Sequence, residues 1–228
     1  MTVRIEKKYT FNQLEKNSVR DWLLALPSGF EEVFNKREVN SLYFDSHDHS
    51  CYEENLSGVS KRGKARLRWY NDINLESSKV TFEMKVKSNS YGNKLSHHLN
   101  LKDLNITSSC HELMIQLRKL LPNDILPYFD SFTEPSLLVS YQREYYKDFY
   151  KKVRVTLDDK IIFSKPRYEN LFSIHSNQKI PMNHGVLEVK IEKASESEDE
   201  WNKIFFSNNL IRAGRHSKYA IGINSTNS

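Results

Sequence analysis

The chain has 228 residues, of which 38% are hydrophobic and 12% aromatic, which is enough for one domain with a core rich in Tyr and Phe. These values exclude a chain that is disordered throughout, and a formal net charge of +5 favours anionic partners without identifying them. Two cysteines are too few for a disulfide framework, and no apolar run approaches the roughly 20 residues that cross a bilayer, so we expect a cytoplasmic protein.

In chain order, the sequence predicts many strands interrupted by a few helices. Strands are predicted over 3–9, 38–46, 64–71, 79–87, 93–101, 137–146, 151–158, 160–164 and 185–193. Helices are predicted from Thr10, with Gln13 at the capping-box spacing, to before Pro27, and over 109–121 and 198–209. The remaining predictions are loops over 46–63 and 166–184, a single domain over 1–223 and a disordered tail over 224–228.

Charged or polar residues, many of them basic, occupy every second position in several of the predicted strands. Examples are the runs 64–68 (Lys-Ala-Arg-Leu-Arg), 83–87 (Glu-Met-Lys-Val-Lys) and 154–158 (Arg-Val-Thr-Leu-Asp). Because successive strand side chains point to opposite faces, each run places its charges on one face of a sheet. A single run of this kind is typical of a solvated face. The recurrence along the chain instead favours a closed antiparallel sheet with a positively charged interior that holds a polyanion.

Eight short motifs follow one another in the order found in a known family. They are the segments 4–9 (RIEKKY), 41–45 (SLYFD), 64–70 (KARLRWY), 82–85 (FEMK), 141–145 (YQREY), 153–158 (VRVTLD), 187–190 (LEVK) and 217–219 (SKY). This ordered set resembles the VTC domain, the polyphosphate polymerase domain of the CYTH-like triphosphate tunnel metalloenzyme superfamily. The resemblance implies an α+β fold that is mainly β, with a closed eight-stranded antiparallel barrel and flanking helices.

The resemblance also implies a set of residues that contact phosphate inside the barrel. Position by position, the catalytic contacts would be Lys8, Arg66, Arg68, Lys85, Arg143, Arg154 and Lys218. Further substrate-binding residues are predicted at Lys87, Lys94 and Lys190. Arg offers paired donors that match phosphate oxygens, while Lys supplies a compact charge, so both residue types suit a triphosphate or polyphosphate.

The resemblance places the metal-binding carboxylate at Glu188, and Glu6 is predicted to assist it. A hard divalent cation such as Mn²⁺ or Mg²⁺ takes oxygen ligands and usually one or two carboxylates beside substrate phosphates and waters. The alternative for Glu6, and equally for Glu83 and Glu192, is an ion pair with a neighbouring Lys or Arg across the sheet. The run from His47 to Cys51 contains alternating metal-ligand types, but no second cluster follows it, so we interpret it as a loop.

Related hydrolases carry Glu-x-Glu-x-Lys on the first strand, whereas this chain has Arg4 in place of the first Glu, followed by Glu6 and Lys8. A phosphate terminus is already an anionic nucleophile and needs positioning more than activation. The sequence therefore predicts a polyphosphate polymerase that uses ATP. A triphosphate or polyphosphate hydrolase and a non-catalytic polyphosphate or nucleotide-binding module stay open as alternatives, as does a membrane partner, and nucleic acid is not expected.

Overall fold

The computed structural model describes residues 4–71, 79–88, 91–100, 103–104, 109–167, 178–192, 197–214 and 216–227. Its strands are β1 (Arg4–Asn12), β2 (Glu31–Asp45), β3 (Lys61–Tyr70), β4 (Val80–Ser88), β5 (Tyr91–Leu99), β6 (Glu134–Lys147), β7 (Val153–Ser164), β8 (Ile180–Pro181), β9 (His184–Glu192) and β10 (Arg212–Ala213). Its helices are η1 (Gln13–Glu15), α1 (Lys16–Leu24), α2 (Ser50–Ser57), α3 (Cys110–Leu120), α4 (Leu126–Phe129), α5 (Ser197–Phe206) and α6 (Lys218–Asn227). None of these helices is long and apolar enough to cross a bilayer.

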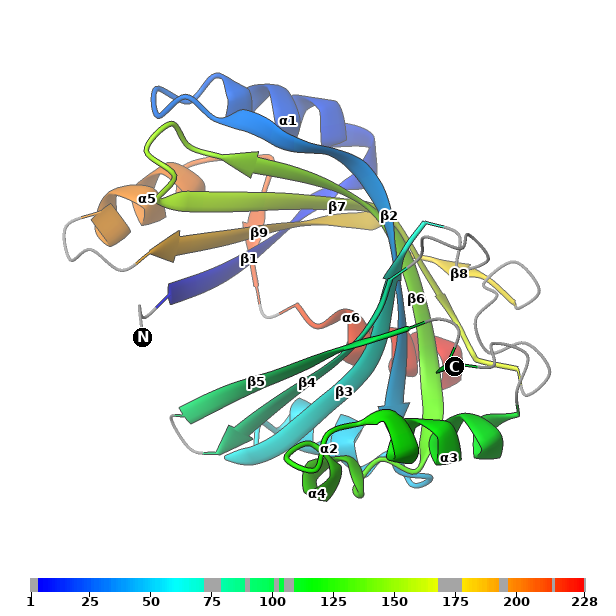
Figure 1. Ribbon diagram of the computed structural model, residues 1–228. Helices are drawn as coiled ribbons and strands as arrows, with labels where there is room; N and C mark the ends of the chain where they lie inside the picture. The colour runs from blue at the N-terminus through cyan, green and yellow to red at the C-terminus, as the bar shows by residue number, and fades with distance from the viewer. Residues whose placement is uncertain are drawn as a thin grey trace. The chain divides into compact units, whose positions relative to one another are not determined.

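The strands of the described residues form one sheet, and the predicted α+β class with mainly antiparallel strands is confirmed. The order is β10-β1-β9-β7-β6-β2-β3-β4-β5, with β8 beside β7 (Figure 1). The prediction of a closed eight-stranded barrel is wrong, because this sheet has 10 strands and no pairing among the described residues joins β10 to β5. Alternating charges determine which face of a strand is polar, but they do not determine whether the outer edges of the sheet meet.

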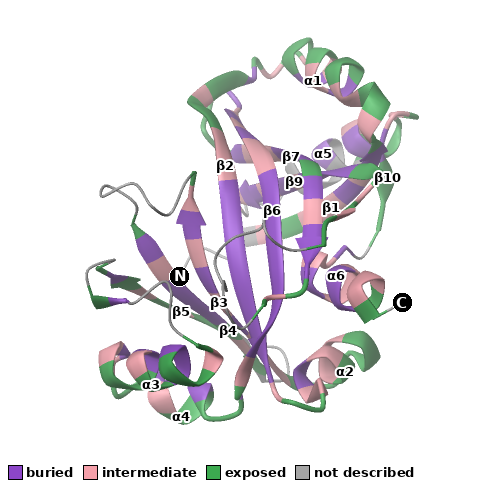
Figure 2. Cartoon of the chain, turned by 90° about the vertical axis from the view of Figure 1, so that its right-hand side faces the viewer, coloured by how far each residue is buried: buried purple, intermediate pink, exposed green. Residues whose placement is uncertain are grey.

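The chain divides into two compact units. Unit 1 comprises Met1–Glu38, Tyr141–Ile161 and Pro181–His216, and unit 2 comprises Val39–Ser140, Ile162–Ile180 and Ser217–Ser228. The single domain predicted for 1–223 stays a prediction. Burial along β2 changes near this boundary, with mostly exposed residues at its start and buried residues over 39–45 (Figure 2).

Unit 1 has its own core on one face of β1, β9 and β7. Alternate residues such as Tyr9, Leu187 and Val155 are buried there against the apolar sides of α1 and α5. From α5, the ring of Phe205 stacks on Tyr9 with their centroids 5.6 Å apart. The alternation sends the intervening residues of these strands, including Lys8 and Glu188, to the opposite face.

Unit 2 has a second core on one face of β2, β3, β4 and β5. Residues such as Leu67 and Phe82 are fully buried against side chains of α3 and α4, including Leu117 and Phe129. Helix α6 packs closely at Gly222, where an added Cβ would lie 2.5 Å from Leu137 and 2.8 Å from Phe163. The opposite face of the same strands carries the charged residues of the alternating pattern.

Four local predictions differ from the structure. Strand β1 continues past Thr10 to Asn12, whose side chain accepts a hydrogen bond from Leu14 N and caps η1. The predicted loop over 46–63 contains α2, and the two strands predicted over 151–158 and 160–164 are the single strand β7. The predicted tail is helical as far as Asn227. Much of the predicted loop over 166–184 lies outside the described residues.

Candidate functional site

Unit 2 presents a basic face on β3, β4 and β5, opposite its core. We define the basic face by Lys64, Arg66, Arg68, Lys85, Lys87 and Lys94. The antiparallel register places Lys85 directly between Lys64 and Lys94, so three lysines form a row across three strands. The structure therefore brings together five residues that the sequence predicted as phosphate contacts, Arg66, Arg68, Lys85, Lys87 and Lys94, and adds Lys64 to them.

Glu83 lies at the centre of this face and pairs with three of its cations. Arg66 donates to Glu83 Oε2 from Nε at 2.8 Å, and Lys94 Nζ donates to Glu83 Oε1 at 2.8 Å. Arg68 Nη1 lies 3.4 Å from Glu83 Oε2. Burial alone would raise the pKa of Glu83, but Arg66 and Arg68 outweigh burial and hold that pKa far below its ordinary value. Glu83 therefore forms the ion pairs with neighbouring Lys and Arg side chains that were the predicted alternative to metal binding.

Two polar atoms beside this network lack a partner. In the described part of the chain, Nε of Arg68 and Oγ of Ser41 are buried without a hydrogen-bond partner. The two residues lie opposite each other in the pairing of β2 with β3. A buried donor without an acceptor costs free energy, which a phosphate oxygen placed between these residues would recover.

Tyr43 extends the basic face on β2. Its hydroxyl accepts a hydrogen bond from Arg66 Nη1 at 2.9 Å, and Tyr43 is opposite Arg66 in the register. Burial alone would raise the pKa of Tyr43, but the guanidinium groups of Arg66 and Arg68 outweigh burial and lower the pKa to about 8. Lys218, the first residue of α6, contributes in the same direction. The sequence reasoning assigned no role to Tyr43, although its place two residues after Ser41 puts both on one strand face.

The first turn of α6 is held against this face by Tyr219. The Tyr219 hydroxyl donates a hydrogen bond to the buried carboxylate of Asp45, and its ring stacks on Tyr43 with centroids 5.2 Å apart. The same carboxylate also accepts hydrogen bonds from two backbone N–H groups at the start of α2, one on each of its oxygens. Next to Tyr219, Ser217 Oγ accepts a hydrogen bond from Lys64 Nζ at 2.9 Å. Lys218 is therefore fixed beside the basic face by residues that the sequence reasoning did not place in the site.

Unit 1 holds an acid–base cluster of Glu6, Lys8, Glu188 and Lys190 on β1 and β9. Lys8 Nζ lies 3.3 Å from Glu6 Oε1 and 4.0 Å from Glu188 Oε2, and it donates to the carbonyl of His216 at 3.3 Å. Lys190 Nζ lies 2.6 Å from Glu188 Oε1. Burial would raise the pKa of Glu188, but Lys190 and Lys8 outweigh burial and lower the pKa to about 2. Glu188 is consequently ionised over the physiological range.

The two predicted arginines of unit 1 each pair with a carboxylate. Arg143 donates to both oxygens of the buried Asp158, from Nε at 2.5 Å and from Nη2 at 2.7 Å. Burial would lower the pKa of Arg143, but Asp158 raises it well above the ordinary value. Arg154 Nη2 lies 3.2 Å from Glu192 Oε1 at a half-exposed position. Asp158 thus orients Arg143, a role that the sequence did not reveal.

The acid–base cluster fits a divalent metal as a partial site. Glu188 and Glu6 supply carboxylate oxygens, and Thr156, opposite Glu188 in the register, has a buried hydroxyl without a partner in the described residues. No group of three or more His, Cys, Asp or Glu side chains in the described ranges is arranged to hold a metal. Mg²⁺ commonly keeps several waters and uses one or two carboxylates together with substrate phosphates, so the donor set suits a metal that arrives with its substrate.

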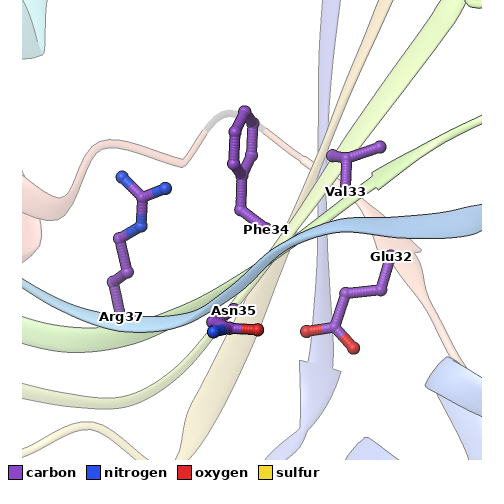
Figure 3. Close-up of a pocket in the computed structure, with 5 residues that line it drawn as sticks. All are labelled: Glu32, Val33, Phe34, Asn35 and Arg37. Carbon is purple, nitrogen blue, oxygen red and sulfur yellow. The ribbon is translucent and has the colours of Figure 1, made fainter.

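A shallow hollow of about 540 Å³ lies elsewhere, along β2 in unit 1 (Figure 3). Phe34 and Arg37 line it with the guanidinium carbon 5.0 Å from the ring centroid, and Glu32, Val33 and Asn35 complete it. None of these five residues was predicted in the site. The hollow therefore shares no lining residue with the basic face or the acid–base cluster.

Comparison with known proteins identifies a family and likenesses to solved structures. A family model described as VTC domain matches residues 3–227. The X-ray structure of a "putative adenylate cyclase" from Vibrio parahaemolyticus is similar with a TM-score of 0.52 and 10% identity, covering 96% of this chain and 97% of that chain. At this identity the likeness concerns the fold alone. The Schizosaccharomyces pombe Mediator head module gives a TM-score of 0.43 at 8% identity over 90% of each chain, which carries no argument. No curated protein matches.

Proposed function

The chain belongs to the VTC domain family, and on that basis we propose that it is a metal-dependent polyphosphate polymerase that transfers the γ-phosphate of ATP to a growing phosphate chain. The observation that carries the proposal is the pair of buried, unsatisfied polar atoms on Arg68 and Ser41 within the described basic face. A phosphate oxygen satisfies both and adds the negative charge that this face lacks.

The basic face supplies binding and charge neutralisation. Arg66 and Arg68 are preorganised by Glu83, so their donors are held in place before substrate arrives. The row of Lys64, Lys85 and Lys94 extends this positive charge across three strands, which suits a linear chain of phosphates better than a single orthophosphate. Phosphoryl transfer depends mainly on such positioning and electrostatic stabilisation.

The acid–base cluster supplies the carboxylates for the metal. Glu188 is held ionised by Lys190 and Lys8, and Glu6 Oε1 lies 3.3 Å from the Lys8 ammonium group. When bound there, Mn²⁺ or Mg²⁺ would neutralise charge on the phosphoryl group that is transferred. Lys8 keeps the two carboxylates close together by balancing their charge.

Polymerisation is preferred to hydrolysis because of the nucleophile that each reaction needs. The terminal phosphate of a chain is already anionic and must be held in line with the donor, a task for cations. Hydrolysis needs a water molecule to be activated, and Arg4 stands where the related hydrolases have a carboxylate. The balance of charges on β1 therefore supports transfer to phosphate.

The test is to incubate the purified chain with ATP and Mn²⁺, resolve the products by gel electrophoresis and assay free orthophosphate. A ladder of phosphate chains is expected. Arg68→Ala should lower kcat/KM for ATP by at least about 100-fold, the usual cost of one preorganised donor to a transition state. Glu188→Ala should abolish the metal-dependent part of the activity. Arg118→Ala is the matched control, because this half-exposed arginine pairs with Asp130 away from the basic face.

The products distinguish the remaining functions. Release of orthophosphate from tripolyphosphate without chain growth would make the protein a hydrolase. Tight binding of tripolyphosphate without turnover, unchanged in Glu188→Ala, would make it a binding module. A ladder that survives in Arg68→Ala would contradict the role assigned to the basic face.

A further inference from the structure

The turn that joins β6 to β7 in unit 1 (Figure 1) carries two adjacent aromatic residues with exposed side chains, Phe149 and Tyr150. Phe149 is 74% exposed and Tyr150 is 70% exposed, and their rings pack edge to face with centroids 5.4 Å apart. These values exceed the exposure of every other aromatic side chain reported for the described residues. An apolar pair displayed in this way is unfavourable in water unless something covers it.

Hydrogen bonds fix the conformation of this turn, so the fold itself keeps the two rings exposed. The buried Asp148 carboxylate accepts the N–H of Val153 at 2.7 Å, and the Asp148 carbonyl accepts the N–H of Lys151 at 2.9 Å. Lys151 adopts a positive φ of 58°. The N–H of Phe149 donates to the carbonyl of Ser28 at 3.1 Å, which ties the turn to the segment after α1. Little conformational entropy remains to be lost when the two rings bind a partner.

The surroundings of the two rings are basic. Lys147, Lys151 and Lys152 lie within three residues of them, and the carboxylate of Asp148 is buried and hydrogen bonded within the turn. Glu31 and Glu32, at the exposed start of β2, are the acids nearest to Ser28 in the sequence and offset part of this charge. Aromatic residues that sit at the water boundary beside lysines are typical of segments that enter the interface of an anionic bilayer.

Two other partners fit less well. Nucleic-acid bases stack on open aromatic faces, but here the edge of one ring already packs against the face of the other. A second copy of the chain would need a far larger apolar surface than two side chains, because stable interfaces bury more than about 1,000 Å² in total. A lipid surface requires only shallow insertion of a few side chains together with contacts to head-group phosphates.

We propose that the β6–β7 turn is a membrane-docking loop that inserts Phe149 and Tyr150 into the interface of an anionic bilayer, with the neighbouring lysines on the lipid phosphates. The tyrosine hydroxyl remains at the level of the head groups, as is usual for interfacial tyrosines. This role is independent of the proposed polymerase activity. The turn would contact the membrane surface only, and none of the described helices could cross a bilayer.

The test is flotation of the full chain with phosphatidylcholine vesicles containing roughly 30% phosphatidylserine, compared with vesicles of phosphatidylcholine alone. Binding is expected to the anionic vesicles. Phe149→Ser combined with Tyr150→Ser should weaken it at least about tenfold, since burial of both rings is lost. Lys151→Gln and Lys152→Gln should each weaken it about fivefold at low salt, and less at high salt. All four side chains are exposed, so these variants should keep the native circular dichroism spectrum.

Tyr128→Ser is the matched control, because Tyr128 is a 49% exposed aromatic residue on α4. It should bind vesicles like the unmodified chain. The proposal is overturned if the unmodified chain does not float with anionic vesicles, or if the serine variant of the turn floats equally well. It is also overturned if the turn variants change binding to a single-stranded oligonucleotide, or the sedimentation of the chain alone, while vesicle binding stays constant.

Discussion

Glu83 is the residue on which the electrostatics of the basic face depend. It is 8% exposed and accepts from Arg66 and Lys94 while lying near Arg68. A buried carboxylate in this position both stabilises the fold and limits the positive charge available to a ligand. Stability and anion affinity should therefore respond to its removal in opposite directions.

We expect Glu83→Gln to lower the free energy of unfolding by about 3 kcal/mol, because the neighbouring cations lose their shared partner. The same change should raise the affinity for tripolyphosphate, which replaces the missing negative charge. Urea unfolding with and without tripolyphosphate measures both effects. A variant that lost stability but gained no affinity would show that the ligand does not contact these cations.

Tyr43 should titrate in an unusual range. Its pKa is lowered to about 8 from the ordinary 10.0, so the folded state releases this proton before the unfolded state does. Ionisation of Tyr43 therefore adds nothing to the free energy of unfolding below pH 8. Its contribution grows as pH rises from 8 to 10 and is complete above that range. A shift of this size corresponds to up to about 3 kcal/mol.

The measurement is the ultraviolet absorbance of phenolate as a function of pH, compared between the unmodified chain and Tyr43→Phe. The difference should show one phenol that ionises near pH 8, and urea unfolding should show a stability gain in the unmodified chain alone as pH rises further. Bound tripolyphosphate should move this transition to higher pH, because its negative charge opposes ionisation. Identical titrations in the two proteins would contradict the assigned environment.

At the scale of elements, Tyr219 attaches α6 to the site by a hydrogen bond and a ring contact. Tyr219 donates to Asp45 and stacks on Tyr43, while Lys218 is the first residue of the helix and Ser217 immediately precedes it. We expect Tyr219→Phe to cost about 1–3 kcal/mol of stability, since the buried carboxylate loses a donor. It should also weaken tripolyphosphate binding several-fold, because the first turn of α6 is less firmly placed.

The matched control is Tyr146→Phe in unit 1. The Tyr146 hydroxyl also donates to a buried carboxylate, that of Glu144, at 2.7 Å. This variant should lose similar stability and keep its affinity for tripolyphosphate, as measured by calorimetry on both proteins. Equal losses of affinity would mean that Tyr219 acts only through general stability.

The sequence predicted the faces of the strands better than it predicted their assembly. Period-2 alternation places Arg66 and Glu188 opposite the cores, as the structure has them. Sheet closure depends on pairing between distant segments and leaves no mark in a local pattern. Helix α2 was missed because its first turn is stabilised by Asp45, which belongs to the preceding strand, and the helix itself buries only Cys51.

The sequence named the cations of the candidate site, but it did not reveal the side chains that pair with them. Arg66, Arg68 and Lys94 were named from sequence, and the structure adds the shared Glu83 that holds them. The resemblance named Lys218, but the Tyr219 contact that places it is a tertiary feature. Such partners come from strands and helices far apart in the chain, so no spacing rule finds them.

For the whole molecule, the excess of positive charge predicts that phosphate chains stabilise the folded state when they bind. The net charge is +5, and each of the two units packs its own core behind a charged strand face. Cations that repel one another in the free protein are relieved when an anion binds. Binding to the folded state alone raises the free energy of unfolding by about 2.7 kcal/mol at a concentration 100 times Kd.

We therefore expect tripolyphosphate to raise Tm by about 5–10 °C at that concentration, measured by differential scanning calorimetry at low salt. The rise in Tm should shrink as salt is added, because Lys85, Lys87 and Lys94 of the basic face are exposed and therefore screened. Lys85→Gln combined with Lys94→Gln should reduce both the rise and its salt dependence. Orthophosphate should have a much smaller effect, since one phosphate spans fewer of these charges. An equal rise with orthophosphate and tripolyphosphate would mean that the protein responds to single anions and that the lysine row does not bind a phosphate chain.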